Sequence, residues 1–286
     1  ELVDVSTPTG VRERLEGVSL VLHAGEIVAV AGVSGNGQVA LAELLCGMRS
    51  ASQGRVTLQG QALPAHPAKL VALGVARIPE DRHAVGVVGD LPVWENAVSE
   101  RLRSRAFSAG PWVRRNAARL HAQRVMEAFD VRGGGPLTPA RSLSGGNMQK
   151  LILGRALMAP ADESAGADAG EAGLDAGPPQ GEASPPGGQR PAQRRSVGAP
   201  TLIVAHQPTW GLDIGAVSYV QQQLIAARDA GAAVLLISDD LDEVMALGDR
   251  IAVMHHGHLS DALPADTWTR ESIGLAMAGH GVAHAA

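Results

Sequence analysis

The sequence predicts an α/β fold built on a parallel β-sheet with helices on both faces. Two almost entirely apolar segments, Thr201 to Ala205 and Ala233 to Ile237, have the composition of parallel strands buried on both faces. A third strand, Glu26 to Ala31, is rich in β-branched residues and runs into a glycine-rich turn, followed by a helix expected at Val39 to Leu45. A strand, a glycine-rich turn and a helix in this order form the context that a phosphate-binding loop requires.

Composition and charge narrow the class of protein. The chain has 286 residues, is 45% hydrophobic and carries a net charge of −5, so it can bury a large core and gives no electrostatic support to a nucleic-acid partner. Its one cysteine, Cys46, excludes an internal disulfide and fits a reducing compartment. No apolar run approaches the ~18 residues of a membrane-spanning helix, so we expect a soluble globular protein. Because the chain begins at Glu1 rather than Met, we expect it to be a segment of a longer protein.

The glycine-rich turn, Gly32 to Val39, departs from the consensus G-x-x-x-x-G-K-[ST]. Gln38 and Val39 stand where the consensus has Lys, which neutralises the β- and γ-phosphates, and Ser or Thr, whose hydroxyl binds Mg²⁺. The turn therefore has the glycines of the consensus but lacks the positive charge of its lysine. Taken alone it also fits a dinucleotide-binding turn or an ordinary loop.

Strands and helices are expected along most of the remaining chain. Leu2 to Val5, Val18 to Leu22 and Gly54 to Leu58 are predicted as strands, the last in a small N-terminal sheet. Asn96 to Val131 has Arg and apolar residues at helical spacing, and Asp249 to Leu259 is predicted to form a closing hairpin. The segment from Ala161 to Pro200 consists mainly of Ala, Gly, Pro, Ser, Gln and charged residues, which predicts a disordered insertion.

A second glycine-rich turn, Leu143 to Lys150, is predicted to bind an anion at a helix start. Ser144 supplies a hydroxyl, Gly145 and Gly146 let backbone amides approach a ligand, and the following helix adds its positive N-terminal end. For Ser-Gly-Gly alone, an ordinary helix cap is the simpler interpretation. The whole octapeptide Leu-Ser-Gly-Gly-Asn-Met-Gln-Lys, however, closely resembles the signature motif of ABC-transporter ATPase domains, in the variant found in importers for sugars and nucleosides.

The other motifs of that family occur in the same order, with substitutions. Glu80 stands where the resemblance implies the Q-loop glutamine, although a charged solvated loop is an alternative interpretation of that segment. His206 and Gln207 occupy the Walker B positions of the Asp that holds Mg²⁺ and the Glu that polarises water, and Asp239 replaces the switch histidine. Leu2 to Leu20 contains no aromatic residue to stack on an adenine.

The resemblance implies a P-loop NTPase fold of the ABC ATPase type, with a RecA-like parallel sheet core, a small antiparallel β subdomain and a helical subdomain. The implied parts are residues 1–84 (β subdomain and first part of the ATP-binding core), 85–160 (helical subdomain with the signature), 161–200 (insertion) and 201–286 (second part of the core). The implied nucleotide-binding residues are Gly32, Ser34, Gly35, Asn36, Gly37, Gln38, Val39, Glu80 and His206. The signature residues are Leu143, Ser144, Gly145, Gly146, Asn147 and Gln149; the D-loop residue is Asp213; and the degenerate catalytic positions are Gln207 and Asp239. No metal site is assigned, because His255, His256 and His258 are more simply interpreted as solvated turn residues.

In the family such domains pair head to tail, so that each ATP lies between one P-loop and the other domain's signature. The resemblance therefore implies the second ATPase domain of an importer for a nucleoside or sugar, with a nucleoside favoured, whose signature completes a partner's ATP site. ATP and Mg²⁺ are the implied cofactors, mainly at that shared site. The implied partners are a first ATPase domain, membrane permease subunits and, indirectly, a solute-binding protein, with the chain held at the cytoplasmic face of the membrane. The alternatives are a soluble ABC ATPase without transport and a non-hydrolysing scaffold.

Overall fold

The computed structural model describes residues 1–8, 13–160 and 200–280. Its large sheet contains β3 (Ile27–Ala31), β6 (Val75–Ile78), β9 (Leu202–His206), β10 (Ala233–Ser238), β11 (Arg250–His255), β12 (His258–Leu259) and β13 (Leu263–Pro264). This seven-stranded sheet has the order β12-β11-β3-β10-β9-β6, with β13 paired to β11. The predicted parallel sheet is confirmed, because successive strands in the run β11-β3-β10-β9-β6 pair in parallel, whereas β12 and β13 pair antiparallel with β11.

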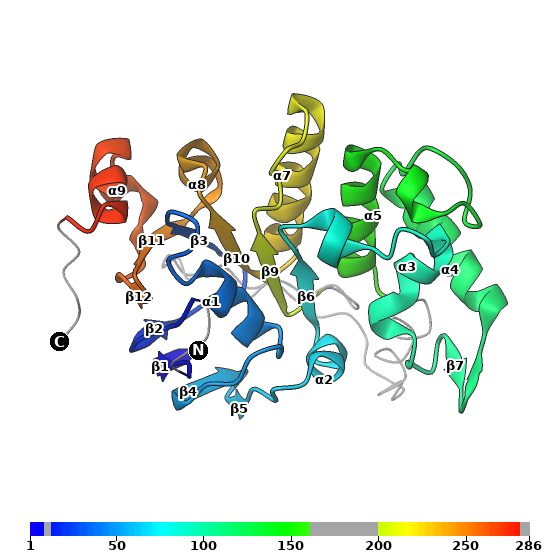
Figure 1. Cartoon of the computed structure of the whole chain (residues 1–286), viewed down its shortest axis with the longest axis horizontal. Coiled ribbons are helices and arrows are strands. Elements are labelled where there is room, and N and C mark those ends of the chain that lie inside the picture. The colour runs from blue at the N-terminus through cyan, green and yellow to red at the C-terminus, as the bar shows by residue number, and fades with distance from the viewer. Residues whose placement is uncertain (9–12, 161–199, 281–286) are drawn as a thin grey trace, which may run out of the picture.

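Side chains of the central strands alternate between two hydrophobic cores. On β3, Ile27, Ala29 and Ala31 belong to one core, whereas Val28 and Val30 belong to the other. Helices α7 (Ile214–Asp229) and α8 (Leu241–Leu247) cover the first face, and α1 (Gln38–Leu45) covers the second (Figure 1). Because both faces are covered, these strands are continuous apolar runs in the sequence.

The small antiparallel sheet packs below α1 in Figure 1. It consists of β1 (Leu2–Ser6), β2 (Val18–Leu20), β4 (Gln53–Leu58) and β5 (Gln61–Ala62), in the order β2-β1-β4-β5. The N-terminal strands that were predicted are therefore confirmed. Helix α2 (Pro67–Ala72) then leads into β6 at the edge of the large sheet.

The helical lobe lies beyond β6, at the right of Figure 1. Its main helices are α3 (Val93–Val98), α4 (Arg115–Ala128) and α5 (Gly145–Leu157), with the short helices η2 (Ser99–Arg101) and η3 (Ala140–Ser142). The helical prediction for 96–131 is wrong over part of that range, because β7 (Ser108–Ala109) and β8 (Trp112–Val113) form an antiparallel hairpin there. Gly110 and Pro111 between these strands favour a turn over a helix.

The carboxyl ends of the parallel strands lead into the segments that form the site. After β6 the chain enters η1 (Arg82–Gly86), a π-helical turn capped by the Asp81 side chain, which accepts hydrogen bonds from His83 N and Ala84 N. The predicted closing hairpin is confirmed, since β12 pairs antiparallel with β11 across the turn at 256–257. Helices α8, η5 (Ala265–Thr267) and α9 (Arg270–Met277) were not predicted.

Two further predictions concern the insertion and membrane-spanning helices. The insertion predicted at 161–200 lies outside the described residues except for Pro200. Within residues 1–8, 13–160 and 200–280, no helix is long and apolar enough to cross a membrane. The division of the chain into four functional parts stays a prediction.

Candidate functional site

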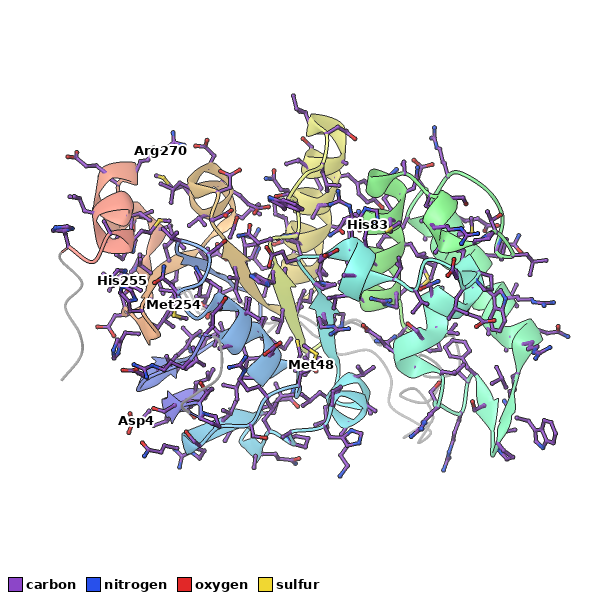
Figure 2. All side chains as sticks on the ribbon, viewed as in Figure 1. Asp4, Met48, His83, Met254, His255 and Arg270 are labelled. Carbon is purple, nitrogen blue, oxygen red and sulfur yellow. The ribbon has the colours of Figure 1, made fainter. Side chains whose placement is uncertain are left out.

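The glycine-rich loop after β3 is fixed by the β11–β12 hairpin. The Asn36 side chain donates to Val33 O over 2.8 Å and accepts from His256 N over 2.9 Å, while Gly257 N donates to Asn36 O over 2.7 Å. The loop also approaches Met254, which Figure 2 labels on β11: a Cβ at Gly32 would lie 2.8 Å from the Met254 carbonyl oxygen. Glycine is therefore required at position 32 by close packing.

Gln38 is folded into this loop and does not project from it. Its Nε2 donates to Val33 O over 2.8 Å, and its Oε1 accepts from Asn36 N over 3.0 Å. Only 4% of the residue is exposed. The side-chain oxygen of Gln38 therefore takes an amide hydrogen that an open phosphate-binding loop offers to its ligand.

Glu13 closes the same loop from outside, and sequence reasoning did not find it. Its Oε2 accepts from Val39 N, in the first turn of α1, over 3.1 Å. Arg49 donates to the Glu13 carbonyl oxygen over 2.7 Å, and Glu13 has a left-handed backbone with φ of 59°. No motif marks this residue, because it lies between two strands of the small sheet and approaches α1 only in the folded chain.

The carboxyl end of β9 places His206 and Gln207 beside the loop. His206 is 9% exposed and its Nε2 lies 3.7 Å from Glu80 Oε2, while Gln207 Oε1 faces Asp239 N at 3.5 Å. Burial lowers the pKa of His206 against the opposing effect of nearby carboxylates. Burial, followed by the negative charge of Asp239, raises the pKa of Glu80. His206 is therefore favoured as a neutral ring and adds no positive charge.

These groups surround a cavity of about 550 Å³. Its lining includes the acids Glu13, Glu43 and Glu80, together with Arg49 as the one cation among the described lining residues. Arg49 is itself paired with Glu43 over 2.7 Å, so no uncompensated positive charge faces the cavity. Side-chain oxygens occupy two loop amides, those of Asn36 and Val39, and three carboxylates line the cavity, so this environment favours a nucleotide triphosphate less than an open phosphate-binding loop does. The remaining lining residues are Ser34, Gly35, Gln38, Val39, His206 and Gln207.

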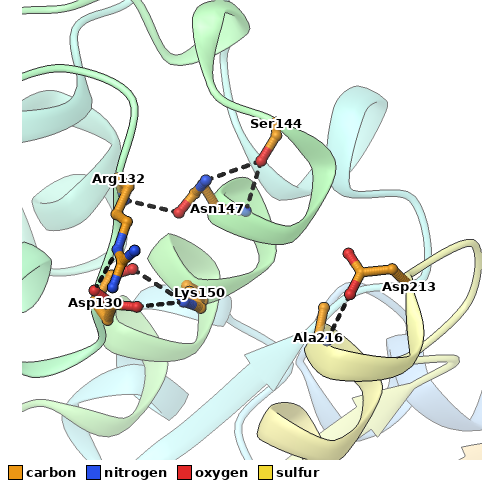
Figure 3. A network of polar contacts seen from close by, with 7 residues as sticks. All are labelled: Asp130, Arg132, Ser144, Asn147, Lys150, Asp213 and Ala216. Atoms are coloured by element: carbon orange, nitrogen blue, oxygen red, sulfur yellow. Dashed lines mark hydrogen bonds and ion pairs between the residues drawn. The ribbon is translucent and has the colours of Figure 1, made fainter.

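The turn at Ser144 is organised differently (Figure 3). Ser144 caps α5, and its Oγ accepts from Asn147 N over 3.4 Å and from Asn147 Nδ2 over 2.9 Å. Asn147 Oδ1 in turn accepts from Arg132 N over 2.7 Å. Gly145 N and Gly146 N precede the helical ladder, and no side chain of the described residues accepts from them. Ser144 is exposed, and Gly145 and Gly146 beside it are half-buried.

Asp213 lies against this turn at the start of α7. Its Oδ1 accepts from Ala216 N over 3.0 Å, and a Cβ at Gly146 would lie 3.9 Å from its Oδ2. Gln149, 2% exposed on α5, donates to Pro208 O over 2.8 Å. The structure therefore brings Ser144, Gly146 and Asp213 together on one surface, separate from the cavity at the Gly32 loop, and Leu143 supports them from the core.

The histidines of the closing turn have protein partners. His255 Nδ1 lies 3.1 Å from Met277 O, and His258 Nε2 lies 3.2 Å from Glu16 Oε2. Among the residues that the structure describes, no group of three or more His, Cys, Asp or Glu is arranged to hold a metal ion.

Comparison with known proteins identifies the family. The sequence profile of the ABC transporter family matches residues 15–162, more than half of the chain. The chain belongs to the ABC transporter family of ATP-binding domains. The predicted membership of the ABC ATPase family is therefore confirmed, and so is the predicted P-loop NTPase fold.

Curated relatives of this ABC domain are import proteins. It is 37% identical over 276 residues to the glucose import ATP-binding protein TsgD13 of Haloferax volcanii, covering 96% of this chain and 43% of that protein. It is 35% identical over 267 residues to the nucleoside import ATP-binding protein NupA of Lactococcus lactis, covering 93% of this chain and 45% of that protein. The ABC domain thus spans less than half the length of these relatives.

Solved structures agree on the fold. A nucleotide-free ATP-binding cassette from an ABC transporter matches with a TM-score of 0.66 at 19% identity, over 98% of this chain and 95% of that one. A second structure, an ATP-binding subunit of an ABC transporter, matches with a TM-score of 0.64 at 20% identity, over 96% of this chain and 93% of that one. At this level of identity the likeness concerns the fold alone.

Proposed function

We propose that this domain serves an ABC importer of a nucleoside or sugar as the donor of a signature motif. In this proposal its own P-loop site is degenerate, and its signature completes the ATP site of a second ATPase domain. Isolated from that partner, the chain hydrolyses ATP at no more than background rate. The domain is the C-terminal of two ATPase domains, and permease subunits hold it at the cytoplasmic face of the membrane. A solute-binding protein delivers the solute to them.

The observation that carries the proposal is the contrast between two helix N-termini. At α1, Val39 N donates to Glu13 and Asn36 N donates to Gln38, so amides that would bind phosphate are satisfied within the chain. At α5, the amides of Gly145 and Gly146 have no hydrogen-bond partner among the described residues, and both glycines are half-buried. Because the positive end of a helix favours an anion where its amides are free, the second site suits an external phosphate and the first does not.

Each residue of the α5 turn has a defined part in the proposal. Ser144 Oγ accepts two hydrogen bonds from Asn147, so its own proton is left for an external acceptor. Asn147 is held in turn by Arg132 N, which fixes the orientation of the hydroxyl. ATP bound to a partner P-loop, with its Mg²⁺, supplies the reacting phosphate. This chain binds and orients that phosphate through Ser144 and the amides of Gly145 and Gly146.

The reconstituted transporter tests the proposal through its steady-state ATPase rate. Ser144→Arg places bulk where the partner-bound phosphate is expected, and loss of one preorganised donor typically costs ~10²- to 10³-fold in rate. Gln207→Ala changes a position in the degenerate site, so the rate should fall only severalfold. Ser142→Arg is the matched control, because Ser142 is an exposed serine two residues away whose hydroxyl bonds Pro139 O. Equal losses from Ser144→Arg and Gln207→Ala would contradict signature donation.

The filled P-loop favours a second candidate, a scaffold with no part in hydrolysis. The same measurement separates the two functions, because a scaffold leaves ATPase activity unchanged when Ser144 is replaced. For the solute, we propose a nucleoside. Uptake by cells carrying the whole transporter tests this choice: unlabelled nucleosides should compete for it, and competition by free sugars alone would overturn it.

A further inference from the structure

Arg82 joins the start of η1 to the loop between β9 and α7. Its Nη1 donates to Trp210 O over 2.6 Å, and its Nη2 donates to Gly211 O over 3.1 Å. Both acceptors are backbone carbonyls of the D-loop segment that leads to Asp213, the cap of α7. The two nitrogens therefore fix the D-loop backbone from outside its own strand and helix.

The same guanidinium borders the signature. A Cβ at Gly145 would lie 3.2 Å from both Nε and Nη2 of Arg82, closer than most Cβ contacts. Arg82 Nε is buried without a hydrogen-bond partner among the described residues. Arg82 thus fills the space between Gly145 and the D-loop, and the absence of a side chain at Gly145 leaves room for it.

Helix α5 holds the neighbouring elements at two further points. Arg155, 6% exposed on α5, donates to Gly86 O at the other end of η1 over 2.8 Å. Gln149, also on α5, donates to Pro208 O just before the segment that Arg82 contacts. The signature helix, η1 and the D-loop are therefore linked pairwise, and Arg82 supplies the direct link between η1 and the D-loop.

We infer that Arg82 is a positioning residue that presents the signature and the D-loop to the partner domain in one fixed arrangement. This inference rests on the proposed function, since it concerns the site that Ser144 completes. Among the described residues, the Arg82 side chain donates to two backbone carbonyls, those of Trp210 and Gly211. Its removal should therefore alter the placement of Ser144 relative to Asp213 and leave the nucleotide contacts of the partner P-loop unchanged.

Arginine suits this positioning role better than lysine does. Arginine offers a rigid planar fork that donates to two acceptors at once, whereas lysine carries a single mobile ammonium. Trp210 O and Gly211 O belong to consecutive residues, so a fork serves both and an ammonium holds one at a time. Lysine at this position should restore part of the positioning.

The test is the ATPase activity of the reconstituted transporter carrying Arg82→Ala, Arg82→Lys or Arg105→Ala. Arg105 is an exposed arginine of the same lobe and is the matched control. We expect Arg82→Ala to lower kcat by roughly tenfold, within the ~10²-fold that a misplacement of about 1 Å can cost, with the KM for ATP unchanged. Arg82→Lys should fall between Arg82→Ala and wild type, and Arg105→Ala should match wild type. Millimolar guanidinium added to Arg82→Ala should recover part of kcat, which a loss of folded protein does not allow.

The outcomes separate this inference from the proposed function. If Ser144→Arg abolishes activity while Arg82→Ala keeps wild-type kcat, the positioning inference is overturned and signature donation stands. If Ser144→Arg has no effect, the proposed function fails first. A rise in KM with unchanged kcat in Arg82→Ala, or the absence of any recovery by guanidinium, would also overturn the inference.

Discussion

Replacing Glu13 should open the P-loop of this domain to nucleotide. Wild-type Glu13 accepts from Val39 N over 3.1 Å, at the position where a phosphate oxygen would compete for the same hydrogen. Glu13→Ala removes both the competitor and its charge, whereas Glu13→Gln removes the charge and keeps an acceptor oxygen. We therefore expect ADP affinity to increase in the order wild type, Glu13→Gln, Glu13→Ala.

The magnitude follows from one charge contact and one hydrogen bond. Two like charges 4 Å apart repel by ~1 kcal/mol in water and ~4 kcal/mol at an effective dielectric constant of about 20. Glu13 is half-buried beside an open cavity, so the lower part of this range applies. Releasing Val39 N adds ~1 kcal/mol. Since each ~1.4 kcal/mol is tenfold in Kd, Glu13→Ala should bind ADP about 10- to 100-fold more tightly than wild type.

Isothermal titration of the purified chain with ADP measures this change. Glu16→Gln is the matched control, because Glu16 lies three residues away and pairs with Arg14 and His258 rather than with the loop. Thermal unfolding supplies a second measurement: Glu13→Gly should be more stable than Glu13→Ala by about 1 kcal/mol, since glycine adopts the left-handed backbone at φ 59° without strain. If Glu13→Ala binds ADP no more tightly than Glu16→Gln, the loop is not closed by this carboxylate.

Three further predictions concern the buried contacts and the chemistry. Gln149→Ala should lower the free energy of unfolding by about 1 to 3 kcal/mol, because Pro208 O loses its buried donor. Urea denaturation measures this change, and Gln123→Ala is the control because Gln123 is an exposed glutamine on α4. Equal losses of stability in the two variants would contradict the prediction. Burial, followed by the positive charges of nearby arginines, lowers the pKa of His121 to about 4. Between these two pKa values the unfolded chain binds a proton at His121 that the folded chain does not. The contribution of His121 to the free energy of unfolding is therefore fully present above pH ~6.5 and is lost as the pH falls towards 4, with a slope of at most ~1.4 kcal/mol per pH unit. Urea denaturation between these pH values should show a shallower dependence in His121→Phe. The purified chain should hydrolyse ATP at no more than background rate, and turnover of ~1 s⁻¹ or faster that Gln38→Ala abolishes would contradict this.

The strands of the large sheet were predictable because their burial is a local property of the sequence. Along β10, Ala233 to Ser238 is buried at every position, and a continuous apolar run of this length is typical of a strand buried on both faces. The hairpin at 108–113 was missed because arginines and apolar residues on both sides give a helical period, which the short strands interrupt for only a few residues. Helix α8 was missed although Asp240 is a strong capping residue that accepts from Asp242 N and Glu243 N.

The candidate site was predictable only where a motif is contiguous. Ser144, Gly145 and Gly146 follow one another in the chain, so the sequence alone places them in one turn, and their binding role stays a prediction. Glu13 and Val39 are separated by 26 residues, and Arg82 and Trp210 by 128, so only the folded chain brings them together. The loss of Lys at position 38 was visible in the sequence, whereas the use of Gln38 to fill the loop depends on the position of its side chain.

The substitutions in the P-loop and the contact of Glu13 have one physical explanation. A loop whose amides point inward without a lysine or a bound phosphate leaves several donors unsatisfied, which costs ~1 to 3 kcal/mol for each buried group. Gln38 Oε1 and Glu13 Oε2 each satisfy one of these donors, so the loop keeps its shape without a ligand. A preserved shape matters if the partner domain docks against this surface, because the dimer then closes on a rigid face. We therefore interpret the loop at 32–39 as a P-loop stabilised by its own chain, and we propose that the Ser144 turn is the part of the domain left for a nucleotide.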